Sequence, residues 1–173
     1  MLRSFRDGAI LKTAAGSGFM VAFNSWYYSF SPALAGYLYT HSAERTVMKF
    51  LLYPLIGILK VSSMTFSVAS GFPELAALLS GLVASSLIGA FYLGLPLSLI
   101  RAKVRRWRGR GAGIERGLAV GLLGSVAVLL ASEILGSQLV MTWSSVTVVL
   151  SALFLSAMMT SARIARKLQP LRN

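Results

Sequence analysis

The chain has no cysteine, one histidine and only five acidic residues among its 173 residues. Without cysteine it can form neither a disulfide framework nor a thiolate metal site, and it has no cysteine nucleophile. A zinc site needs three or four protein ligands, and the sparse, scattered histidine and carboxylates do not provide such a cluster. The sequence therefore predicts no metal and no cofactor.

Charge is scarce as well. Charged residues make up 13% of the chain, against about 25% in ordinary soluble domains. Hydrophobic residues make up 55%, and the mean hydropathy is +0.70. This balance is typical of an integral membrane protein, whose helices face lipid rather than water.

Three long apolar runs predict an all-α, polytopic membrane protein with spans at 75–100, 117–135 and 139–160. The first and third runs contain no charged residue, and the second is interrupted only near its end by Glu133. Each is long enough to cross a hydrocarbon core of about 30 Å as a helix.

Residues 47–68 form a possible fourth span, and two topologies follow from it. If this segment crosses the membrane, there are four spans and both termini lie inside. If it lies along or dips into the outer leaflet, there are three spans and the N-terminus lies outside. Charge counting favours four spans, whereas Lys60 and Pro54 within the segment favour three.

Basic residues outnumber acidic residues 17 to 5 and concentrate at the ends of the apolar runs. Lys and Arg beside membrane spans mark the cytoplasmic side and bind anionic lipid headgroups. We therefore interpret loop 101–116 and the C-terminus as cytoplasmic parts of a multi-pass plasma-membrane protein, with lipid rather than nucleic acid as the partner. The lipid-binding candidates in the loop are Arg101, Lys103, Arg105, Arg106, Arg108 and Arg110.

The N-terminal segment 1–73 differs from the transmembrane region 74–173 and is predicted as a separate, amphipathic and interfacial domain. Its start reads as a short surface helix with Leu2, Phe5 and Ala9 on one face and Arg3 paired with Asp7. The Ser-Pro step further on predicts a new helix with Ser31 as N-cap and Pro32 in its first turn. Aromatic and polar residues in between are candidates for interfacial anchoring or partner docking: Asn24, Trp26, Tyr27, Tyr28, Ser31 and Pro32.

The segment from Leu2 to Leu38 resembles the C-terminal region of the CFI-box family of archaeal and bacterial surface proteins. The resemblance is carried by LRSFRD at 2–7, by the spacing of Leu11, Thr13, Gly16 and Phe19, by WYYSFSP at 26–32, and by Ala35. It extends through the helix with Pro54 to about residue 59, although the Cys-Phe-Ile box itself is absent. The resemblance implies a membrane-associated module next to an extracellular domain, with no known catalytic activity.

Small residues recur every fourth position in two of the predicted spans. This spacing lets helix backbones approach closely in lipid, so we expect the two spans to pack against each other or against a partner. The candidate packing residues are Gly81, Ser85 and Gly89 in the first span and Gly117, Gly121 and Ser125 in the second.

Few residues are suited to catalysis. His41 lies in a polar stretch without a nucleophile motif around it, and we interpret it as a turn residue. The sequence favours a non-enzymatic anchor or accessory subunit of a larger membrane or surface complex, or of a homo-oligomer. The alternative is a small transporter or channel that uses Glu133, because an acidic residue inside a span is a candidate for ion or proton handling.

Overall fold

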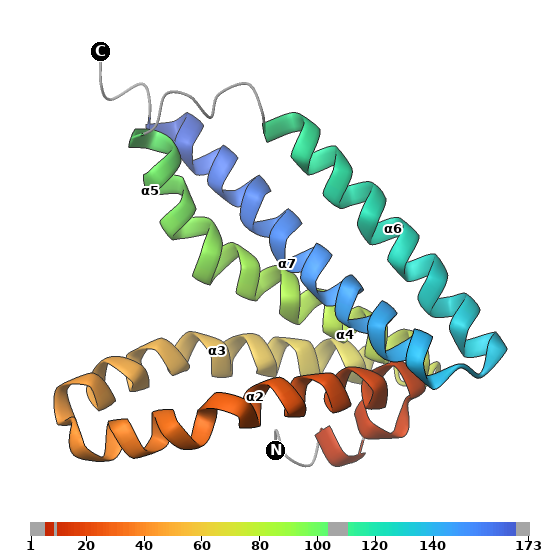
Figure 1. Ribbon diagram of the computed structural model, residues 1–173. Coiled ribbons are helices and arrows are strands. Elements are labelled where there is room, and N and C mark those ends of the chain that lie inside the picture. Colours follow the sequence, from red (N-terminus) through yellow and green to blue (C-terminus); the bar gives the residue numbers. More distant parts are fainter. Residues whose placement is uncertain (1–5, 9, 104–110, 169–173) are drawn as a thin grey trace.

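The computed structural model describes residues 6–8, 10–103 and 111–168 (Figure 1). Within these ranges the chain is helical, with short turns between elements and no strand, which confirms the all-α prediction. The elements are η1 (Ile10–Lys12), α2 (Ala14–Thr40), α3 (Ser42–Val68), α4 (Pro73–Ile88), the π-helical segment η2 (Gly89–Gly94), α5 (Leu95–Lys103), α6 (Gly111–Leu135) and α7 (Gln138–Leu168).

Four of the described helical segments are long and apolar enough to cross a membrane: Ser42–Val68, Pro73–Arg101, Gly113–Ser132 and Gln138–Lys167. The second and the last contain the predicted spans 75–100 and 139–160, since α4, η2 and α5 form one continuous rod. The third covers the predicted span 117–135 up to residue 132, and helix α6 covers all of it. The first contains the possible fourth span. The polytopic helical fold is therefore as predicted.

Three long helices stand side by side as a bundle (Figure 1): the rod formed by α4, η2 and α5, then α7, then α6. Helix α7 packs against α6 on one side and against α4, η2 and α5 on the other. Gly136 makes the tight turn from α6 to α7 possible, because its φ of 65° lies in the left-handed region that glycine adopts without strain.

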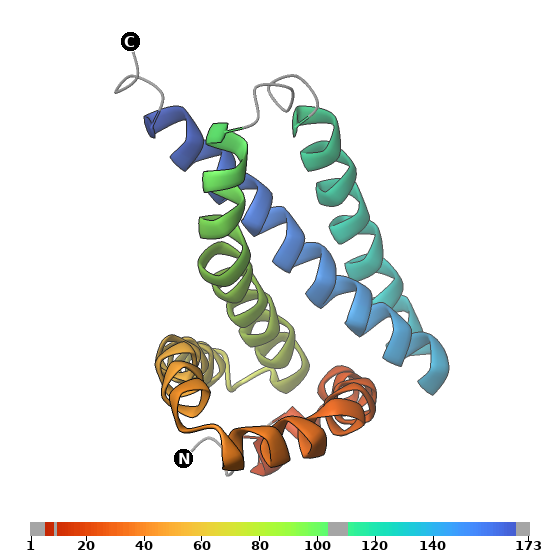
Figure 2. The same cartoon turned by 60° about the vertical axis from the view of Figure 1, so that its left-hand side comes forward.

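Helices α2 and α3 form a hairpin that lies obliquely across one end of the bundle (Figure 2). This is the end where α4 begins and where α6 turns into α7. Close packing holds it there: Gly18 of α2 lies against Thr142 of α7, and the Ser62 hydroxyl of α3 donates to the Ser80 carbonyl of α4 at 2.8 Å.

The prediction of a helix start at Ser31 is wrong. Helix α2 runs without a break from Ala14 to Thr40 with Pro32 inside it. Its true N-cap is Thr13, whose hydroxyl accepts from the Gly16 N–H at 3.2 Å. Proline lacks the N–H that would bond to the carbonyl four residues earlier, but one lost bond is tolerated in a helix that is otherwise continuous on both sides.

The predicted surface helix at the N-terminus is only partly covered, because residues 1–5 and 9 lie outside the described ranges. The Arg3–Asp7 pair and the face formed by Leu2, Phe5 and Ala9 therefore stay predictions. In the described part, Arg6 donates its Nε–H to Asp7 at 2.6 Å, and this hydrogen bond together with the charge of Asp7 raises the pKa of Arg6 above its ordinary value.

Small side chains make the closest helix contacts. The fully buried polar side chains include Ser80, Ser98, Ser132 and Ser161, and each donates its hydroxyl to a carbonyl three residues earlier in its own helix. These serines therefore bury no unmet donor and present a surface as narrow as alanine. A Cβ added at Gly89 would lie 2.0 Å from the Leu153 carbonyl oxygen of α7.

We predict that Gly89→Ala destabilises the protein although alanine is the better helix former. The added methyl group overlaps a backbone atom that has no freedom to move, and such overpacking costs roughly 1–3 kcal/mol. The measurement is the thermal unfolding midpoint in detergent. Gly81→Ala in the same rod is the matched control, because its Cβ meets no described atom within 4 Å. Equal midpoints for the two variants would contradict the close contact.

Candidate functional site

The aromatic residues of α2 form a stacked row along the helix. Phe19, Phe23 and Tyr27 are spaced four residues apart, with ring centroids 5.8 Å apart at each step. Trp26 and Phe30 pack edge to face at 4.8 Å. Contacts of this kind between residues one helical turn apart stabilise the helix and fix the orientation of the rings.

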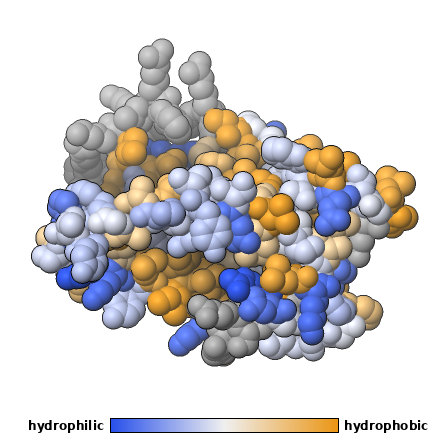
Figure 3. Space-filling model, turned by 60° about the horizontal axis from the view of Figure 1, so that its bottom comes forward, coloured by the Kyte–Doolittle hydropathy of each residue, from blue (hydrophilic) through white to orange (hydrophobic). Residues whose placement is uncertain are grey.

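Several of these rings are exposed. Trp26 and Tyr28 keep 62% and 66% of their surface accessible, and Pro32 is also exposed, whereas Asn24 and Ser31 are half-buried. The end of the molecule that carries the hairpin shows hydrophilic and hydrophobic residues side by side (Figure 3). Such a mixed, aromatic surface suits the headgroup layer of a membrane. The choice between anchoring and docking stays a prediction.

The packing residues predicted in the first span do not act as a single face. Gly89 lies directly against α7, whereas Gly81 has open space around its Cβ within the described chain. Ser85 is buried and donates to the Gly81 carbonyl at 2.8 Å. Helix α7 packs extensively against both this span and α6. The expectation that the small residues of the two spans pack against each other or against a partner stays a prediction.

The predicted residues of α6 divide between two faces. Ser125 is buried toward the bundle with 8% exposure, whereas Gly117 and Gly121 are exposed. A Cβ added at either glycine would meet no atom of the described chain within 4 Å. Residues four apart are rotated by about 40° from each other around a helix. Three residues at this spacing therefore do not all lie on one face.

The predicted basic loop 101–116 is described at its two ends, where residues 101–103 belong to α5 and residues 111–116 to α6. Arg101 reaches from α5 to α7, where its Nη1 donates to the Met158 carbonyl at 3.1 Å. Lys103 ends α5. Arg105, Arg106, Arg108 and Arg110 lie outside the described residues. The structure therefore ties the first of the predicted lipid-binding arginines to the bundle, next to the basic end of α7.

The titratable candidates are dispersed. Glu133 lies in the last turns of α6, but its side chain is outside what the structure describes, so its part in transport stays a prediction. His41 sits at the exposed turn between α2 and α3 and stacks on Tyr37 at 4.0 Å. Among the described residues, no three His, Asp or Glu side chains come together in a way that would hold a metal ion.

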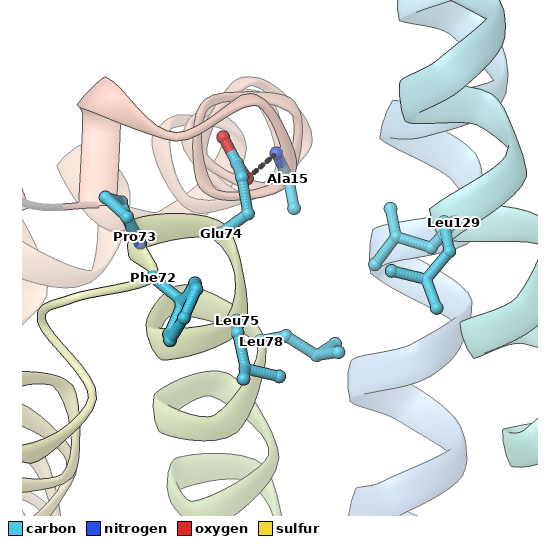
Figure 4. A pocket seen from close by; sticks show the side chains of 8 residues that line it. Ala15, Phe72, Pro73, Glu74, Leu75, Leu78 and Leu129 are labelled. Carbon is cyan, nitrogen blue, oxygen red and sulfur yellow. Dashed lines mark hydrogen bonds between the residues drawn. The ribbon is translucent and has the colours of Figure 1, made fainter.

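Sequence reasoning missed a carboxylate that joins two helices. Glu74, in the first turn of α4, accepts a hydrogen bond from the N–H of Ala14 at 2.8 Å. It also accepts from the N–H of Ala15 at 3.5 Å, the bond drawn in Figure 4. These donors belong to the first turn of α2, which has no helical acceptor for them. One side chain thus places its charge at the N-termini of both α2 and α4, where the helix dipoles favour it. Only the folded arrangement brings residues 60 positions apart together.

Two neighbouring cavities lie between the hairpin and the bundle. The smaller, of about 360 Å³, is lined by Glu74, Phe72 and apolar residues of α4 and α6 (Figure 4). The larger, of about 580 Å³, lies among α2, α3, α4 and α7. Ala15, Leu78 and Leu129 line both. The larger cavity has an almost wholly apolar wall. Gly81 is one of its lining residues, and a Cβ added there would meet no described atom within 4 Å.

No protein family, curated protein or solved structure matches the chain. The resemblance to the CFI-box family is therefore neither supported nor contradicted, and it stays a prediction.

We predict that Glu74→Ala lowers the thermal unfolding midpoint, because the variant leaves the first N–H groups of α2 without their acceptor. Loss of an N-terminal cap typically costs about 0.5–2 kcal/mol. Glu44→Ala is the matched control, since Glu44 occupies the first turn of α3 but is exposed to its surroundings. If both variants melt at the same temperature, the carboxylate does not hold the hairpin in place.

Proposed function

We propose that the protein is a non-enzymatic, multi-pass membrane protein that serves as an accessory or assembly subunit, binding another transmembrane helix along the outer face of α6. The partner is a helix of another subunit or of a second copy. One observation carries the proposal: the glycines of α6 that are suited to close helix contact have no neighbour in the described chain.

Helix α6 uses only one of its faces within the fold. Residues such as Leu122, Ser125, Leu129 and Ser132 face the bundle and are buried or half-buried. Gly117, Gly121 and Gly124 face away and have open space beyond them. Lipid chains give helices no hydrophobic reason to associate, so close backbone packing at small residues is the main attraction. A helix with glycine on its free face is therefore suited to bind a further helix.

The same arrangement favours three spans with the hairpin at the outer surface. The described basic residues Arg101, Arg166 and Lys167 lie toward the ends of α5 and α7, at the end of the bundle opposite the hairpin (Figure 1). Positive charge beside spans marks the cytoplasmic side and contacts anionic lipid. We therefore place the C-terminus in the cytoplasm and the hairpin, with its exposed aromatic rings, in the outer interface of the plasma membrane.

We predict that a cysteine replacing Ser42, at the tip of the hairpin, reacts in intact cells with a maleimide that does not cross membranes. The chain has no native cysteine to interfere. Ser137→Cys, in the turn between α6 and α7, is expected to react equally, and Gly113→Cys near the opposite end is expected to be protected. Protection at position 42 together with reaction at 137 would show that α3 crosses the membrane as a fourth span.

We predict that the double variant Gly117→Leu and Gly121→Leu releases the partner while the fold is retained, because leucine side chains keep a second backbone at a distance. The measurement is the mass and subunit composition of the complex purified in mild detergent, by light scattering and gel analysis. Gly57→Leu is the control, since this glycine on α3 is also exposed with open space beside it. A native protein that is already a single chain without stoichiometric partner contradicts the proposal.

A further inference from the structure

The larger cavity is partly open to its surroundings and too apolar to fill with ordered water. Its volume of about 580 Å³ lies within the range of small-molecule sites, about 300–1,000 Å³. An empty space of this size is unfavourable because the atoms lining it lose their dispersion contacts on one side. Buried water, in turn, needs two to four polar partners.

The polar groups in the wall are already engaged. The serines among the described lining residues donate their hydroxyls to backbone carbonyls at 2.8–3.0 Å: Ser62, Ser80, Ser85 and Ser145. The remaining lining is mostly aliphatic and aromatic, including Phe19, Leu55 and Val149. These hydroxyls are therefore not free to donate to a polar ligand or to a chain of waters. A hydrocarbon needs no hydrogen bond and is suited to such a lining.

We propose that the cavity binds one acyl chain of a membrane lipid. Lipid chains are the apolar molecules that surround these helices at high concentration, and the cavity lies where the hairpin meets the spans. Arg6 is the charged residue among the described residues that line it, and it is exposed. This places the polar end of the cavity, and so the lipid headgroup, at the N-terminal side of α2. The inference is independent of the α6 face, because Gly117 and Gly121 do not line the cavity.

Gly81 provides a direct test. Its missing side chain leaves open space on the cavity wall, so the ring of Gly81→Phe is expected to occupy the site without displacing described atoms at the Cβ position. We expect the native protein purified in mild detergent to retain about one lipid per chain, measured by native mass spectrometry and lipid extraction, and Gly81→Phe to retain at least fivefold less. Gly57→Phe, on the exposed side of α3, is expected to retain lipid as the native chain does.

Ligand-linked stability gives a second readout. Palmitoyl-oleoyl phosphatidylglycerol added to delipidated protein is expected to raise the unfolding midpoint of the native chain and of Gly57→Phe, since a ligand that binds only the folded state stabilises it. The same lipid is expected to leave the midpoint of Gly81→Phe unchanged. An equal rise in all three proteins would assign the effect to the outer surface and overturn the proposal.

A third measurement needs no variant and therefore does not depend on whether Gly81→Phe folds. The native protein is reconstituted in phosphatidylcholine vesicles that carry a photoreactive diazirine near the end of one acyl chain. Adducts on cavity residues such as Phe19, Leu78 and Ala84 support the site. Adducts confined to exposed residues such as Leu99 and Leu150, or a native chain that retains no lipid, overturn it. Mass spectrometry of the retained molecule distinguishes a phospholipid from a free fatty acid.

Discussion

The fold depends on how closely the rod α4–η2–α5 approaches α7. Helices in lipid gain little from burying apolar side chains against one another, because the surrounding chains are equally apolar. What remains is contact between backbones, and Gly89 and Gly94 allow it where a Cβ would overlap Leu153 or Thr160. The buried serines Ser98 and Ser161 serve the same end, since the hydroxyl of each is bonded within its own helix and leaves a small surface for the neighbour. Helix α7 thereby becomes the central helix, and the placement of α6 and of the hairpin follows from it.

The hairpin adds a different kind of attachment. Glu74 fixes the start of α2 by accepting hydrogen bonds from backbone groups that no helix can satisfy by itself. The Tyr92 hydroxyl of η2 donates to the Leu51 carbonyl of α3, and Ser62 donates to the Ser80 carbonyl. These polar contacts hold the two halves of the chain together around a space that they do not fill. The cavity is thus a consequence of joining an oblique hairpin to a tightly packed bundle.

The positions of the three spans were predictable because a long apolar helix is stable in the hydrocarbon core of a membrane. This holds whichever helices pack beside it. The hairpin was harder to predict. Its helix α2 is rich in tyrosine and serine and contains Pro32, and each of these features locally favours an interruption of the helix. Ring stacking along the helix and packing on α7 keep it continuous. The roles of Glu74 and Gly81 depend on residues distant in sequence. A four-residue repeat of small side chains indicates that a helix is able to pack closely, but it does not identify which helix lies opposite.

The π-helical segment determines which residues of the rod meet α7. In an α-helix each residue advances by about 100°, so positions 89 and 94, five apart, would point in clearly different directions. The wider winding of η2 brings both glycines onto the same neighbour. A single helical wheel drawn through the whole rod is therefore misleading. The α5 part is out of phase with the α4 part, and Arg101 reaches the Met158 carbonyl of α7 from the shifted part. Regular α-helical winding over the same number of residues would turn the α5 part of the rod away from its neighbour.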